Sequence, residues 1–118
     1  MRILVVDDAE MVRTLLAEFF GSLGHEVVTL ESGNTVASEF ARRPFDAVFT
    51  DVAMPGWSGW QVLAVVRAAR PDIPVVFISG WNVDDGGQTT RERPNAIIHK
   101  PFDLDEVRAL LEGLGPRA

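Results

Sequence analysis

Short apolar runs alternate with amphipathic stretches along the chain. The runs lie at 3–6, 27–30, 47–50, 75–78 and 96–98. Between them, apolar residues recur every three or four positions, which is the spacing of one helix face. The clearest such set comprises Met11, Val12, Leu15, Leu16, Phe19, Phe20 and Leu23. This alternation predicts an α/β fold in which helices connect parallel strands.

Helix boundaries are marked by residues with known capping preferences. Gly24 ends the first predicted helix, and Ser32 with the two residues after it begins a second, short one. Ser58 is suited to cap a third helix after a loop, and Asp103 to open the last. Each predicted strand except the fourth is therefore followed by a clear helix.

The strand order follows from how apolar each run is. Three runs are apolar almost throughout, as expected of strands buried on both faces: 3–6, 47–50 and 75–78. The run at 27–30 follows Glu26 and carries less apolar content, and the run at 96–98 is brief, so both suit sheet edges. We therefore expect a flavodoxin-like, doubly wound, five-stranded parallel sheet in the order 2-1-3-4-5, with helices on both faces.

The segment 82–95 fits this scheme poorly. It contains one apolar residue and two adjacent glycines where a helix between the fourth and fifth strands is expected. Glycine in a helix interior is less stable than alanine by about 1 kcal/mol, and a polar segment has no face to bury. We expect a weak or disordered helix here.

Composition and charge narrow the class of protein. A length of 118 residues predicts one domain, 1–118. The absence of cysteine excludes disulfides and thiolate zinc sites, and the net charge of −6 disfavours direct binding to nucleic acid or anionic membrane. Without a recognisable signal or membrane span, we expect a cytoplasmic protein. Lys100 is the only lysine.

Polar residues follow the predicted strands at the edge where such sheets bind ligands. Asp7 and Asp8 follow the first strand, Asp51 the third, Ser79 the fourth and Lys100 the fifth. Carboxylates about 4 Å apart repel by about 4 kcal/mol per pair at an effective dielectric constant near 20, so positive charge must lie among them. Lys100 supplies part of it, and Mg²⁺, which prefers oxygen ligands, is the expected second cation. The pattern predicts phosphoryl chemistry.

Four motifs together resemble one family. These are VVDD at 5–8, TDVAMPGWSG at 50–59, FISG at 77–80 and KPF at 100–102. In this order and spacing they are similar to the receiver domains of two-component response regulators. The resemblance covers essentially the whole chain.

The resemblance implies a role for each matching residue. Asp51 corresponds to the phosphoacceptor, and Asp8, Asp51 and the backbone carbonyl of Ala53 correspond to the Mg²⁺ ligands, with Asp7 acting beside them through water. Ser79 and Lys100 correspond to the residues that bind the transferred phosphoryl group. The family also carries a cis peptide before the proline that follows this lysine, a bond that turns the lysine toward the acids.

Partners and activity are implied in the same way. The donor is a phosphohistidine of a sensor histidine kinase or histidine phosphotransfer protein, and the output is a downstream protein, with a phosphorylation-dependent homodimer as one form of signalling. The chain is then a phosphoacceptor that catalyses only its own phosphorylation and slow dephosphorylation, not a turnover enzyme.

The sequence departs from the family pattern in the residues that usually change conformation on phosphorylation. Ile97 stands where an aromatic residue usually couples to the hydroxyl residue after the fourth strand, and Trp81 is a candidate substitute. We expect 82–95 to become ordered on phosphorylation or partner binding. Near the acceptor, we expect Trp60 to be core and Trp57 to be an exposed loop aromatic that contacts a partner or shields the site.

Three alternative functions make different demands on the sequence. A flavodoxin-type cofactor site requires a Ser/Thr/Gly-rich loop after the first strand, where Asp7, Asp8 and Glu10 instead repel phosphate. A haloacid dehalogenase phosphatase has a second aspartate two residues after its nucleophile, where this chain has Ala53. A pseudo-receiver that works without phosphorylation is the main alternative, although none of the required residues is missing.

Overall fold

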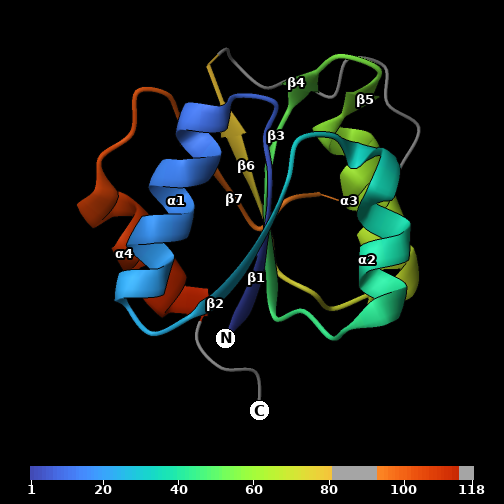
Figure 1. The fold of residues 1–118 in the computed structure, drawn as a ribbon, viewed down its shortest axis with the longest axis horizontal. Helices are drawn as coiled ribbons and strands as arrows, with labels where there is room; N and C mark the ends of the chain where they lie inside the picture. Colours follow the sequence, from blue (N-terminus) through green and yellow to red (C-terminus); the bar gives the residue numbers. More distant parts are fainter. Residues whose placement is uncertain (81–92, 115–118) are drawn as a thin grey trace.

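The computed structural model describes residues 1–80 and 93–114. Its elements follow the predicted alternation of strands and helices, with two short additional strands after β3 (Figure 1). In chain order they are β1 Arg2–Val6, α1 Glu10–Ser22, β2 Glu26–Leu30, the 3-10 helix η1 Gly33–Thr35, α2 Val36–Arg42, β3 Ala47–Asp51, β4 Ala53–Met54, β5 Trp57–Ser58, α3 Gly59–Ala69, β6 Val75–Ser79, β7 Ala96–His99 and α4 Leu104–Leu114.

The five long strands form one parallel sheet in the order β2-β1-β3-β6-β7. Since β6 and β7 are its fourth and fifth strands along the chain, the predicted order 2-1-3-4-5 is confirmed. β2 and β7 lie at the edges, and the residues of β3 and β6 are all buried. The chain changes its direction of winding between the adjacent strands β1 and β3, where sheets of this type bind their ligands.

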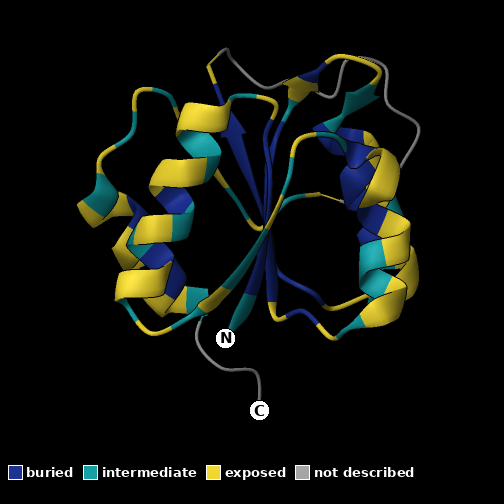
Figure 2. Cartoon of the chain, viewed as in Figure 1, coloured by how far each residue is buried: buried dark blue, intermediate teal, exposed yellow. Residues whose placement is uncertain are grey.

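Helices cover both faces of the sheet, α1 and α4 on one and α2 and α3 on the other (Figure 1). Alternate residues of a strand point to opposite faces. Ile3 and Val5 therefore pack in one core with α1 and α4, whereas Leu4 and Val6 pack in the other with α2 and α3. Figure 2 shows the buried inner strands between helices whose outer sides are exposed.

The buried face of α1 is narrower than the sequence pattern predicts. Leu16 and Phe20 are buried, but Met11 is 77% exposed and Leu15 is 42% exposed. Residues four apart lie on the same side of a helix. Met11 and Leu15 therefore form an exposed row beside the buried row of Leu16 and Phe20. The prediction of a single apolar face was wrong because it merged these two rows.

Other helix boundaries agree with the predicted signals. Ser58 and Gln61 form a reciprocal capping box at the start of α3, and Asp103 Oδ1 accepts the backbone N–H of Asp105 at 2.8 Å. Gly24, after α1, has a φ of 90°, which favours glycine. Within residues 1–80 and 93–114, no helix has the length and apolar character needed to cross a membrane.

Most of the segment predicted to be weak, 82–95, lies outside the described residues, as does Trp81. Its last three residues, 93–95, are described. Asn95 donates its backbone N–H to the carbonyl of Val75 at 2.7 Å, and its Oδ1 accepts from Arg67 Nη2 at 2.6 Å. The first bond holds the entry to β7 against the start of β6, and the second ties it to α3.

A small antiparallel hairpin, β4–β5, follows β3 where the sequence predicts only a loop. Ala53 pairs with Ser58, and Met54 pairs with Trp57. Gly56 in the intervening turn has a φ of 79°, a conformation that glycine adopts without steric cost. The hairpin gives the segment after Asp51 a defined shape.

Candidate functional site

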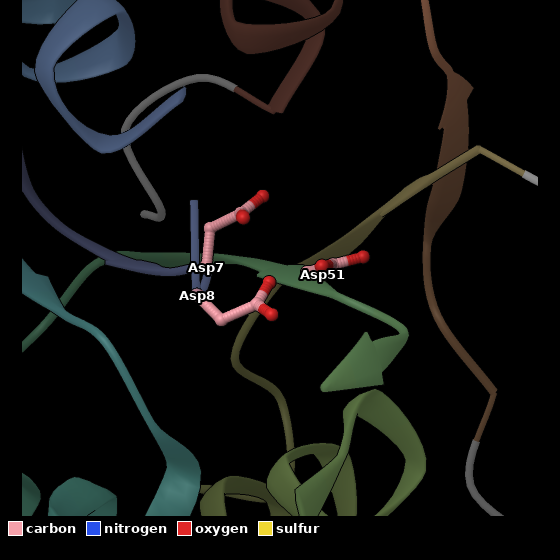
Figure 3. A group of neighbouring side chains, drawn as sticks. All are labelled: Asp7, Asp8 and Asp51. Carbon is pink, nitrogen blue, oxygen red and sulfur yellow. The ribbon is translucent and has the colours of Figure 1, made fainter. Parts of the chain in front are cut away.

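Three carboxylates converge at the carboxyl edge of the sheet. Asp7 and Asp8 follow β1, and Asp51 is the last residue of β3. One oxygen atom of each lies within 4.8 Å of the others. Figure 3 shows the side chains of Asp7 and Asp8 leaving the end of β1 toward the side on which Asp51 lies. Asp7 is fully buried, Asp51 is 6% exposed and Asp8 is exposed.

The alternation that builds the core also brings two of these acids together. Val5 and Phe49 are register partners on β1 and β3, and both face the core under α1 and α4. Asp7 lies two residues after Val5, and Asp51 two residues after Phe49. Because side chains two apart on a strand point to the same face, both acids lie on this face and at matching positions along the two strands. The cluster predicted from strand ends is thus a consequence of register.

Lys100 directly follows the edge strand β7, and its side chain reaches the cluster from there. Its Nζ lies 3.2 Å from Asp7 Oδ2 and 3.8 Å from Asp51 Oδ2. Its backbone N–H donates to the Ser79 carbonyl at 2.7 Å, which extends the β6–β7 pairing by one residue. The Lys100–Pro101 bond is cis, as the family resemblance implied. The lysine therefore contacts both buried acids.

Ser79 and Ala53 occupy positions near Asp51. Ser79 is 4% exposed at the end of β6, one residue beyond Ile78, which is the register partner of Asp51. Ala53 begins β4, two residues after Asp51. Their roles toward a phosphoryl group and a metal stay predictions.

The Asp51 carboxyl has an altered acidity. Burial, followed by the negative charge of Asp7, raises the pKa of Asp51 to about 6, although the Lys100 ammonium opposes the shift. A hydrogen bond with Asp8 further favours the protonated form of Asp51. Well above pH 6 the Asp51 carboxyl is ionised, which is the form that a nucleophile requires.

The donor set suits a hard divalent cation. Three carboxylates face one ammonium group, so the cluster carries excess negative charge at neutral pH. The side-chain donors gathered here are oxygen atoms, which Mg²⁺ prefers. Asp8 is exposed, so the cluster is open to the water molecules that Mg²⁺ usually retains. The acidic pocket fits Mg²⁺ binding.

Two residues that the sequence analysis did not single out support the backbone of the site. Arg13 Nη1 donates to the Asp7 carbonyl at 2.8 Å. Gly59 donates its N–H to the Val52 carbonyl at 2.8 Å, and a Cβ at Gly59 would lie 2.7 Å from the Asp51 carbonyl oxygen. Glycine thus lets α3 begin close to the end of β3. The only local signal for it is its position directly after the helix cap.

The two tryptophans that follow Asp51 in the chain differ in their surroundings. Trp60 is 7% exposed and its ring meets Phe77 edge-on with centroids 5.0 Å apart, so the prediction of a core residue is confirmed. The prediction that Trp57 is exposed was wrong. Trp57 is half-buried, packs on the core under α2 and α3, and contacts Gly33. Ile97, in the switch position, is 38% exposed.

Comparisons of sequence identify relatives with the same pattern. Residues 3–112 match the model of a family described as response regulator receiver domain. The response regulator protein FleR of Pseudomonas aeruginosa is 33% identical over 112 residues, which cover 94% of this chain and 23% of FleR. The chain therefore spans about a quarter of the length of that relative.

Solved structures share the fold. TrrA, a response regulator of Thermotoga maritima solved in complex with Mg²⁺–BeF, superposes with a TM-score of 0.83 at 29% identity, covering 96% of this chain and 97% of TrrA. CheY4, a chemotaxis protein of Vibrio cholerae, gives a TM-score of 0.86 at 22% identity over 96% and 97% of the two chains, and supports the fold alone. Because the family match extends over nearly all of the sequence, the chain belongs to the response regulator receiver domains of two-component systems.

Proposed function

We propose that this chain is a phosphorylatable switch whose acceptor is Asp51. Receiver domains are signalling phosphoacceptors rather than turnover enzymes. The observation that carries the proposal is the position of Lys100 Nζ, 3.2 Å from Asp7 and 3.8 Å from Asp51 in a cluster of three carboxylates. An acceptor, an ammonium group and a candidate metal site lie together.

The proposed donor is a phosphohistidine of a sensor kinase or a histidine phosphotransfer protein. A carboxylate oxygen of Asp51 forms a bond to phosphorus as the P–N bond to histidine breaks. The electron pair of the broken bond stays on the imidazole nitrogen, which takes up a proton. Ser79 donates its hydroxyl hydrogen to the transferred group and Lys100 pairs with it. Slow hydrolysis of the resulting acyl phosphate ends the signal.

Asp8, Asp51 and the carbonyl of Ala53 are the proposed Mg²⁺ ligands, with Asp7 beside them through water. When bound, Mg²⁺ neutralises charge on the transferring group. The chain contributes position: adjacent strands fix the acids, and the β6–β7 pairing fixes the lysine. The complex of TrrA with Mg²⁺–BeF supports the same chemistry at 29% identity.

The exposed row of α1 is the proposed docking surface for the donor. Met11 and Leu15 lie one turn apart, and with Glu10, Thr14 and Glu18 they line an open hollow. α1 begins three residues after Asp7, so its first turn lies near the carboxyl end of β1 (Figure 1). We propose that the donor contacts this row with apolar residues of its own.

The output partner is a downstream protein that reads the phosphorylated form, and a phosphorylation-dependent homodimer is included in the proposal. Ile97 on the edge strand β7 is exposed and suits such a contact. The proposal keeps the cytoplasmic location that the family implies and assigns no direct nucleic-acid binding to these residues.

Intact-mass measurement after incubation with Mg²⁺ and acetyl phosphate tests the proposal. We expect the wild-type chain to gain one phosphoryl group, and Asp51→Asn to gain none. Lys100→Ala should still bind Mg²⁺ but accumulate less phosphoprotein, whereas Asp8→Ala should lose both properties. Asp105→Asn on α4 is the matched control and should behave as wild type. A wild-type chain that stays unmodified would favour the pseudo-receiver function instead.

A further inference from the structure

We propose that the contact between Trp57 and Gly33 positions the β4–β5 hairpin, and with it the Ala53 carbonyl, relative to the acid pair after β1. Trp57 belongs to the hairpin that follows the acceptor strand, and Gly33 to the turn η1 that follows β2. The inference rests on the proposed function, because it assigns this contact a role in holding the Mg²⁺ site.

The contact is close enough that only glycine fits at position 33. A Cβ there would lie 2.8 Å from Trp57 Cε3 and 3.0 Å from Trp57 Cβ and Cδ2. Gly33 is buried and its φ is not in the positive range, so space rather than backbone conformation requires the glycine. The ring cannot retreat freely, because it also packs on the core under α2 and α3.

Bonds within the hairpin fix its shape, and the Val52 N–H, which donates to the Ile78 carbonyl at 3.3 Å, ties its base to β6. The Gly59 N–H bonds to the Val52 carbonyl, and Ala53 pairs with Ser58, all within one short segment. The ring of Trp57 instead reaches a turn that belongs to the other half of the sheet. The contact is therefore a tie between the hairpin and a different strand.

That other strand is connected directly to the acid pair. The backbone N–H of Asp7 donates to the carbonyl of Leu30, the last residue of β2, at 3.1 Å, and Gly33 lies three residues after Leu30. The Trp57–Gly33 contact thus links the position of Ala53, on one side of the site, to the positions of Asp7 and Asp8 on the other. These are the two groups of ligands that one cation must reach at the same time.

Trp57 is therefore a positioning residue, which holds the hairpin in place but touches no reacting atom. Residues that orient metal ligands without binding the metal commonly change affinity by about 10- to 100-fold when replaced. Gly33→Ala adds one methyl group that displaces the ring, and Trp57→Val removes the ring. Both changes should weaken Mg²⁺ binding while leaving the carboxylates intact.

Calorimetric titration of the full chain with Mg²⁺ at pH 8 tests the inference. We expect Gly33→Ala to raise the Kd by about tenfold. In the double variant with Trp57→Val, adding Gly33→Ala should change nothing further, since no ring remains to be displaced. Gly113→Ala is the matched control, because a Cβ there meets no atom within 4 Å, and its Kd should equal that of wild type. Additive effects of the two changes would overturn the inference.

Hydrogen exchange without metal gives a second readout. In EDTA, the amides of 52–59 should exchange faster in Gly33→Ala and Trp57→Val than in wild type or Gly113→Ala, while urea unfolding shows that each variant is folded. Unchanged exchange in both variants would overturn the inference even if Mg²⁺ affinity fell. If the wild-type chain binds no Mg²⁺, the proposed function fails, and the exchange of 52–59 alone decides whether the contact holds the hairpin.

Discussion

The charges around Asp51 act on its pKa in opposite directions. Burial and Asp7 raise it, Lys100 lowers it, and the result is a value of about 6. Lys100, whose Nζ lies 3.8 Å from Asp51 Oδ2, does not cancel the increase because burial and the charge of Asp7 each have a larger effect. In the metal-free protein, an ionised Asp51 is therefore destabilising.

Replacing Asp51 by asparagine should stabilise the metal-free fold in a pH-dependent way. Because the folded-state pKa of Asp51 lies above the unfolded value of 3.8, the folded protein binds more protons between the two values, and wild-type stability falls as pH rises through this range. The full shift corresponds to about 3 kcal/mol, and solvent screening reduces it. We expect Asp51→Asn to be more stable by about 1 to 2 kcal/mol at pH 8 and equal to wild type near pH 4.

Urea unfolding in EDTA across this pH range measures the difference. The control is Asp105→Asn at the start of α4, which lies outside the cluster and should not reproduce the pH-dependent gap of Asp51→Asn. A constant gap between Asp51→Asn and wild type from pH 4 to pH 8 would contradict the prediction, because a gap that does not depend on pH cannot come from the titration of Asp51.

Among the elements, the long strands were predictable and the finer contacts were not. β3 and β6 are buried on both faces, so apolar runs reveal them directly, and parallel topology then places the acids and Lys100 at one edge. The β4–β5 hairpin has strands of two residues, too short for any periodicity. The packing of Trp57 on Gly33 joins residues far apart in sequence without a local pattern.

The two rows of α1 should respond differently to truncation. Phe20 is fully buried and its ring centroid lies 5.0 Å from that of Phe49, so Phe20→Ala should destabilise the fold by about 3 to 5 kcal/mol. Leu15 is 42% exposed, so Leu15→Ala should remove less than about 1 kcal/mol. Urea unfolding at pH 7 measures both. Similar losses at the two positions would show that Leu15 belongs to the core in solution.

In the molecule as a whole, the site joins two halves of the sheet. Asp7 and its neighbour belong to the half formed by β1 and β2, whereas Asp51 and Lys100 belong to the half formed by β3, β6 and β7. The overall charge of −6 is thus partly concentrated where the two halves meet. A cation bound there contacts both halves in the folded state and has no comparable site in the unfolded chain.

Mg²⁺ should therefore raise the Tm of the chain, and the rise should depend on pH. Binding to the folded state alone adds about 2.7 kcal/mol at a concentration one hundred times the Kd. Carboxylate ligands must be ionised to bind, and the pKa of Asp51 is about 6. Scanning calorimetry with and without MgCl₂ should show a clear shift at pH 8 that declines as pH falls through 6 and is nearly absent at pH 4.5. An equal shift at both pH values would place the bound cation away from Asp51.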